Sequence, residues 1–306
     1  NADVIADYTE SSNVFYKIGA ESATQTCSVV IGDNVTNIPA YLFYCAFDMD
    51  GLTTNGITSV VIGDSVTKIG AYAFSCNEKI TSITWGDSIV VIGNNAFTFC
   101  SIGGDLTLPT SVVTIGDAAF GGTPITSVVI GNNVVSIGAS AFALCSLITN
   151  ISIGTGVTSI GDGAFANCVA VETLNYNANV TTDFATDSNV FTALGLQSAT
   201  GTCNVVIGDN VTNIPACLFY HDIDSDDLYG TNGITSIVIG SGVETIGAQA
   251  FYGCNNVERV DLGSGVKTVG ANAFICYNLN KVYITDLAAW CNIEFMSEDD
   301  DEFSCS

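Results

Sequence analysis

Basic residues are nearly missing from this chain. Six lysines and arginines stand against 31 aspartates and glutamates, which gives a formal net charge of −25 over 306 residues. Nucleic acids and anionic membrane surfaces are bound through Lys and Arg, so this balance argues against both as partners. The acidity instead keeps a chain that is 48% hydrophobic in solution. Cations and basic macromolecules remain compatible partners.

Other absences exclude classes of chemistry. The single histidine and the lack of a nucleophile elbow leave a hydrolytic triad without support. No CxxC pair occurs, which argues against a zinc site. Gly154-x-Gly156 lies at an expected turn and does not open a helix, so it is no nucleotide loop. No apolar run reaches the roughly 18 residues of a membrane span. We therefore expect no enzyme, no catalytic residue and no cofactor.

A unit of about 23 residues repeats along the chain. Each copy joins a run such as ITSVVIG at Ile57–Gly63 to a core such as VTKIGAYAFSC at Val66–Cys76. Such self-similarity marks a solenoid, whose units bury their apolar faces only against their neighbours. A pivotal Ile returns at steps of 23, 23, 22 and 23 residues, at Ile69, Ile92, Ile115, Ile137 and Ile160, with a partner Phe at Phe74, Phe97, Phe120, Phe142 and Phe165. A second array holds Ile214, Ile246 and Val269 with Phe219, Phe251 and Phe274.

Alternation within the unit predicts which side chains face the core. Val60 and Ile62 should point inward, and Ser59 and Val61 outward, because strand side chains alternate. A Gly-Asp turn follows, and then a second short β-branched segment. The Ala-x-Ala-Phe piece is too short for a long helix and predicts one helical or 3₁₀ turn. Stacked units then form a parallel sheet with rungs about 4.8 Å apart.

This pattern resembles the BspA-like leucine-rich repeat family. The resemblance rests on the strand, the G-[DNS] turn, VxxIG and AFxxC, and it covers nearly the whole chain. It implies a leucine-rich-repeat-like parallel β horseshoe with a concave sheet, a secreted or cell-surface location, and adhesion to host or microbial proteins. Departures are modest: Ile replaces Leu at most strand starts, Pro39 and Pro215 replace Gly, and His221 stands where Cys is expected.

A longer duplication is superimposed on the short repeat. Residues 1–63 return as residues 177–240. CSVVIGDNVTNIPAYLFY at Cys27–Tyr44 matches CNVVIGDNVTNIPACLFY at Cys203–Tyr220. Since the second copy is preceded by a strand that the first copy lacks, we expect the chain to begin inside a unit of a longer repeat protein.

We interpret residues 1–306 as a single solenoid. Residues 285–306 depart from the repeat, and we expect Leu287–Trp290 to act as a cap before an acidic tail. Insertions in solenoids emerge as loops at one edge or face, often the binding face. The longer insertions span residues 46–56, 181–202 and 222–233.

Most of the twelve cysteines follow the repeat Phe by two or three residues. Adjacent rungs could bring such sulfurs within disulfide or metal range. Cysteine is also among the most buried residue types, and we favour a ladder of buried free thiols. Cys291 and Cys305 are the least bound to the repeat, and their separation permits a disulfide. The ladder comprises Cys45, Cys76, Cys100, Cys145, Cys168, Cys254 and Cys276.

The only histidine, His221, matches the ladder position of Cys45 through the duplication. It could serve as a ligand or base beside the acidic residues that follow, but we favour a semi-buried substitute for the ladder cysteine. Asp222, Asp224 and Asp226 alternate as in calcium loops. No Glu stands at the twelfth position of such a loop, so a solvated acidic loop without metal is the expectation.

The outward strand face offers the best candidate for a binding surface. Most of it carries Ser, Thr and Val, whereas interface anchors are enriched in Tyr and Arg. We expect a secreted or cell-surface monomer that binds a protein or other macromolecule; the alternative is a structural spacer of a larger surface protein. The candidate residues are Arg259, Asp261, Lys281 and Tyr283, with Ser236 and Val238 on the same face and Asp224 and Asp226 in the flanking loop.

Overall fold

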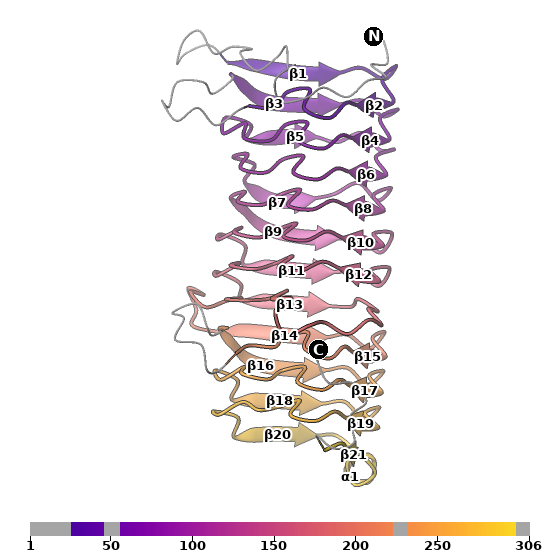
Figure 1. Ribbon diagram of the computed structural model, residues 1–306, viewed down its shortest axis with the longest axis vertical. Helices are drawn as coiled ribbons and strands as arrows, with labels where there is room; N and C mark the ends of the chain where they lie inside the picture. The colour runs from indigo at the N-terminus through magenta and orange to yellow at the C-terminus, as the bar shows by residue number, and fades with distance from the viewer. Residues whose placement is uncertain (1–25, 46–55, 223–231, 298–306) are drawn as a thin grey trace.

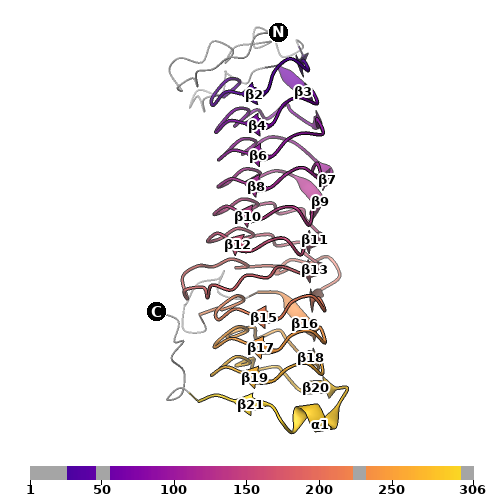
Figure 2. The same ribbon diagram turned by 90° about the vertical axis from the view of Figure 1, so that its right-hand side faces the viewer.

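The computed structural model describes residues 26–45, 56–222 and 232–297. They form an elongated stack of rungs that shows little curvature in either view (Figures 1 and 2), so the expected horseshoe is nearly straight. Parallel strands line two sides of the stack. The longer strands form one row: β1 (Cys27–Ile31), β3 (Ile57–Ile62), β5 (Ser82–Thr84), β7 (Gly104–Thr107), β9 (Ile125–Ile130), β11 (Asn150–Ile153), β13 (Thr173–Tyr176), β14 (Cys203–Ile207), β16 (Ile234–Ile239), β18 (Arg259–Leu262) and β20 (Lys281–Ile284).

Two-residue strands form the second row, which Figure 2 brings to the front. A single helical turn, α1 (Leu287–Trp290), follows the last long strand. Pairing is interrupted between β5 and β7 in the long row and between β12 and β15 in the short row. The short strands are β2 (Asn37–Ile38), β4 (Lys68–Ile69), β6 (Val91–Ile92), β8 (Thr114–Ile115), β10 (Ser136–Ile137), β12 (Ser159–Ile160), β15 (Asn213–Ile214), β17 (Thr245–Ile246), β19 (Thr268–Val269) and β21 (Glu294–Phe295).

Like residues meet across neighbouring rungs. Val128 in β9 pairs with Ile151 in β11, and both are buried. Val129, between the two inward positions of β9, is 55% exposed. This register confirms the predicted alternation, because a slip by one residue would turn the whole apolar set to solvent.

A column of phenylalanine rings fills the core along the length of the stack. Neighbouring rings lie near-parallel with centroids 4.8–5.5 Å apart. Each interior ring therefore contacts one ring above and one below, at a separation typical of favourable aromatic pairs. The column runs through Phe43, Phe74, Phe97, Phe120, Phe142, Phe165, Phe191, Phe219, Phe251 and Phe274.

The Ala-x-Ala-Phe segments differ from the predicted helical or 3₁₀ turn. They form successive turns whose middle residue is left-handed, with φ of 57° at Tyr72 and 55° at Gln249. Alternate amides donate to the next rung, as the Phe74 N–H does to the Ala96 carbonyl at 2.9 Å, and those between them close single local turns, as the Ala73 N–H does to the Gly70 carbonyl at 3.3 Å. Hydrogen bonds to carbonyls of the neighbouring rung are more favourable here than a helical turn, because so short a segment has little helical stability of its own. The sequence of one unit does not show these partners.

Proline marks where the short row begins. In most rungs the Gly after the short strand donates its N–H to the preceding rung, as from Gly247 to the Ile214 carbonyl at 2.8 Å. Pro39 and Pro215 take this position after β2 and β15, which are end strands of their sheets. Proline has no N–H, so an edge strand loses nothing there. The departure from the Gly pattern is thus explained by sheet topology.

Candidate binding surface

The predicted face residues come together on β16, β18 and β20. Ser236 pairs with Arg259 and Arg259 with Lys281, while the row two residues further on joins Val238, Asp261 and Tyr283. Tertiary structure thus gathers side chains from three rungs into one outward patch of two parallel rows. We call these six residues the C-terminal strand face.

Arg259 is the centre of this face. Its Nε donates to Asp261 Oδ1 at 2.6 Å and its Nη2 donates to Asp261 Oδ2 at 2.6 Å, so the two side chains form a bidentate pair. The guanidinium carbon lies 4.3 Å from the ring centroid of Tyr283, a cation–π geometry. The hydrogen bond to Asp261 raises the pKa of the guanidinium. Arg259 is thus pre-oriented while its side chain stays about half exposed.

The last long strand leaves apolar side chains uncovered. Val282 and Ile284 hold the inward positions of β20, yet they are 47% and 37% exposed, whereas their partners Val260 and Leu262 are buried. The helix α1, the expected cap, buries none of its residues. Trp290 at the end of α1 packs against the core, yet Val282 and Ile284 keep these exposed fractions, so the C-terminal strand face borders an apolar rim.

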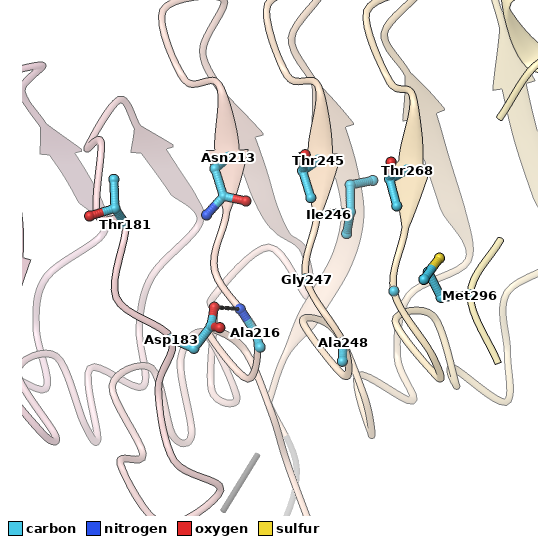
Figure 3. A pocket seen from close by; sticks show the side chains of 11 residues that line it. Thr181, Asp183, Asn213, Ala216, Thr245, Ile246, Gly247, Ala248, Thr268 and Met296 are labelled. Atoms are coloured by element: carbon cyan, nitrogen blue, oxygen red, sulfur yellow. Dashed lines mark hydrogen bonds between the residues drawn. The ribbon is translucent and has the colours of Figure 1, made fainter. Parts of the chain in front are cut away.

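A groove on the short-strand side was not foreseen. Between β12 and β15 the chain makes no short strand, and Asp183 instead accepts the Ala216 N–H on Oδ1 at 2.7 Å. A hollow of about 390 Å³ runs from this irregular rung across β15, β17 and β19 to Met296 (Figure 3). Its lining is mainly apolar, with Ile246 and Ala248 among the lining residues. The sequence signal for this groove was the long insertion that begins at Thr181.

The predicted thiol ladder is confirmed with one correction. All seven cysteines are free and six are buried. Cys76 is only half-buried, with its backbone in the left-handed region, and the next residue, Asn77, takes the inward position. Asn77 Nδ2 donates to the Phe43 carbonyl at 2.8 Å, as Cys100 Sγ does to that of Phe74 at 3.1 Å. The ladder side chain therefore satisfies a buried carbonyl of the preceding rung.

Burial raises the pKa of the ladder thiols and of Cys203 in β14. Desolvation raises the pKa of Cys145 to about 11, and the pKa values of Cys203 and Cys276 to about 12. The thiolate is the species that attacks and ligates, so such groups are poor nucleophiles at neutral pH. Among the described residues no three His, Cys, Asp or Glu side chains are grouped so as to hold a metal.

His221 is buried at the ladder position that the duplication assigns to it. It is 6% exposed, and its Nε2 atom has no hydrogen-bond partner. Burial lowers the pKa of the imidazole, and the nearby Asp222 carboxylate opposes that shift. Asp222 lies on the surface, whereas Asp224 and Asp226 fall outside the described residues. The expectation of a solvated acidic loop without metal therefore stays a prediction, with the calcium loop as its alternative.

Two cysteines outside the ladder differ in their bonding. Cys291 is exposed and free, so it does not pair with Cys305. Cys217, which belongs to the duplicated NIPACLFY segment, is disulfide-bonded and 4% exposed. Sequence could not single it out, because the matching residue of the first copy is Tyr41.

These features define a parallel-strand leucine-rich repeat protein. A family model described as the BspA type leucine-rich repeat region matches residues 11–147, 67–195 and 221–294. The chain therefore belongs to the BspA-type leucine-rich repeat family. No helix within the described ranges is long and apolar enough to cross a membrane.

Solved structures give a looser likeness. A leucine-rich cell-surface protein from Faecalibacterium prausnitzii is 23% identical with a TM-score of 0.45, covering 95% of this chain and 85% of that one. A leucine-rich repeat protein from Bacteroides ovatus is 19% identical with a TM-score of 0.42, covering 89% and 71%. None of the curated proteins compared with the chain matches it significantly. The family assignment rests on the repeat model.

Proposed function

We propose that this protein is secreted or displayed at a cell surface, where it binds a protein or another macromolecule through the C-terminal strand face. The observation that carries the proposal is Arg259, held between the Asp261 carboxylate and the Tyr283 ring with its side chain about half exposed. A pre-oriented Arg loses less side-chain entropy on binding. Arg and Tyr are also the residue types that most often anchor interfaces.

The family and the chemistry of the interior support this role. BspA-type repeats are protein-binding modules in general, and the similar F. prausnitzii protein is described as a cell-surface protein. The buried thiols have raised pKa values and the one imidazole is enclosed in the stack. We therefore assign binding and not catalysis.

A spacer role is the second candidate. The straight stack and the uncovered apolar side chains of β20 suit a segment whose neighbours in a longer protein continue the column. A spacer would need no specific partner, so the two candidates differ in whether the C-terminal strand face recognises a soluble ligand.

The test screens the immobilised protein against extracellular matrix and surface proteins, then measures the affinity of any partner by surface plasmon resonance. The variant Arg259→Ala, Lys281→Ala, Tyr283→Ala should bind at least tenfold more weakly at an unchanged melting temperature. The matched control, Ser28→Ala with Ser59→Ala, alters a hydrogen-bonded pair on the same row near the other end and should bind normally. Unchanged affinity in the triple variant refutes the site, and a screen without partners favours the spacer.

A further inference from the structure

The row of long strands begins with a strand that has one open edge. Among the described residues, β1 pairs only with β3, whereas β14 in the middle of the row pairs with β13 on one side and with β16 on the other (Figure 1). An edge strand presents unpaired backbone N–H and C=O groups that can pair with a further strand. The open side of β1 therefore offers hydrogen-bonding groups to an extended peptide.

The internal duplication shows which kind of strand fits this edge. β1 and β14 hold matching positions of the two copies, and Cys27–Tyr44 repeats the sequence of Cys203–Tyr220 apart from two residues. In the second copy the strand on this side is β13, which runs parallel to β14 and places Leu174 opposite Val205. Within the described ranges, β1 thus carries the acceptor sequence of β14 without the strand that β14 receives.

Backbone hydrogen bonds at the junction of β13 and β14 identify the groups that hold the two strands together. The Asn204 N–H donates to the Glu172 carbonyl at 2.8 Å, and the Gly208 N–H donates to the Tyr176 carbonyl at 3.0 Å. These two donors lie four residues apart at the two ends of β14. Donors of β14 therefore reach β13 and the residue before it from one end of the strand to the other.

The matching groups of the first copy lie at the open edge of β1. Ser28 and Gly32 match the two donors of β14, so their N–H groups face away from β3. The apolar side chain beneath this edge is also less covered than its match: Val29 is partly buried, whereas Val205 is fully buried. A strand added to β1 would therefore satisfy backbone donors and complete the burial of an apolar side chain.

We propose that the open edge of β1 binds an extended segment of another protein by parallel strand addition. The segment has the chemistry of β13, with apolar side chains at alternate positions and uncharged polar side chains between them. Both apolar residues of β13, Leu174 and Tyr176, are fully buried in the stack. In this mode of recognition main-chain hydrogen bonds supply affinity and the alternate side chains supply specificity. The site lies apart from the C-terminal strand face, so it does not rest on the proposed function.

A second copy of this chain is a poorer donor than another polypeptide. Its β13 is paired on both sides, with β11 and with β14, and cannot be supplied without opening the stack. Its β20 has an open edge at the other end of the row, and pairing of that strand with β1 is the rival that the test distinguishes.

A synthetic peptide with the sequence of residues 171–176, VETLNY, tests the proposal. The dye-labelled peptide should bind the full chain saturably in fluorescence anisotropy. The matched control peptide carries Leu174→Ser and Tyr176→Ser, which keep the length and charge but remove two apolar side chains, so it should bind at least about tenfold more weakly. Equal affinities for the two peptides, or no binding of VETLNY, would overturn the proposal.

Amide hydrogen exchange measured by NMR locates the bound peptide. At a peptide concentration about ten times the dissociation constant, exchange at Ser28, Val30 and Gly32 should slow by about tenfold, because the open state is depleted by a factor of one plus the ratio of peptide to dissociation constant. The amides of β20 should keep their rates. Protection on β20, or on neither strand, would overturn the assignment of the site.

The variant Val30→Pro removes an N–H from the open edge, and proline is tolerated on edge strands. It should keep the melting temperature of the wild type and bind VETLNY at least tenfold more weakly; wild-type affinity would show that the backbone of β1 is not the acceptor. Sedimentation velocity without peptide tests the rival. A concentration-dependent dimer that VETLNY dissociates would make a second copy the occupant and overturn the stated partner.

Discussion

Phe142→Ala should destabilise the stack strongly. The ring is fully buried and lies between Phe120 at 5.5 Å and Phe165 at 5.4 Å, nearly parallel to both. Truncation of a core Phe to Ala costs about 3–5 kcal/mol, and the upper half applies where the site cannot collapse. Collapse is hindered here because the Phe142 amide is bonded to the next rung, at the Ala164 carbonyl. We expect a loss of about 4–5 kcal/mol in the free energy of unfolding.

Two companion variants separate the contributions to that loss. Phe142→Leu keeps most of the apolar area but removes two ring pairs, each worth about 0.5–1.5 kcal/mol beyond area, so it should cost about 1–3 kcal/mol. Phe274→Ala removes a partly buried ring with one stacked neighbour, Phe251. It should cost at least about 1 kcal/mol less than Phe142→Ala.

Urea unfolding followed by circular dichroism and by tyrosine fluorescence measures these differences. The free energies can be compared if the two probes give the same transition and the dependence on urea concentration is the same in wild type and variant. This check is needed because a solenoid can unfold in parts. A Phe142→Ala protein within about 1 kcal/mol of wild type would mean that the ring column does not hold the rungs together. Equal costs for Phe142→Ala and Phe274→Ala would refute the argument from two-sided stacking.

Three further predictions concern titration and metal. Burial raises the pKa of Cys145 to about 11, above the ordinary thiol value of about 8.5. The free energy of unfolding should therefore be constant below about pH 8.5 and fall as the pH rises toward 11. Urea titrations should show a smaller fall for Cys145→Ser. Burial lowers the pKa of His221, so the contribution of the neutral imidazole to stability is present above about pH 6.5 and is lost as the pH falls. His221→Cys should make the melting temperature less dependent on pH on the acid side. An unaltered pH profile would contradict this. Millimolar calcium should leave the melting temperature unchanged, whereas a rise abolished by alanine at Asp222, Asp224 and Asp226 would establish the alternative.

Periodicity by itself determined the fold class. Each unit places Val, Ile and Phe at positions that alternate on a strand, and only stacking against copies of the same unit can bury them. The inward positions of Val128 and Ile151 therefore follow from the repeat, as does the free-thiol ladder. The prediction of a helical or 3₁₀ turn for the Ala-x-Ala-Phe segment was wrong. Alternate amides of this segment bond to carbonyls of the next rung, which the sequence of one unit does not show.

The Phe-to-Cys spacing was a weaker guide. A Cys two residues after Phe lies inward at Cys276 but outward at Cys76, where Asn77 takes its place. Whether the turn absorbs one residue or two depends on how it pairs with the neighbouring rung. Contacts between rungs therefore decide which residue faces inward, and the sequence of a single unit does not show it.

The candidate surfaces divide in the same way. Sequence selected Arg259, Asp261 and Tyr283 by residue type, since an outward row of Ser and Val lacks anchors. Asp261 lies two residues along the same strand, so alternation alone places it on the same face as Arg259. Tertiary structure decided that the Tyr283 ring contacts the guanidinium, because strand register sets which side chains become neighbours across rungs. Sequence also located the insertion after Thr181. The groove itself depends on the fold. The insertion forms no short strand, and the rungs from β15 onward stay stacked beside it, so a hollow remains between them.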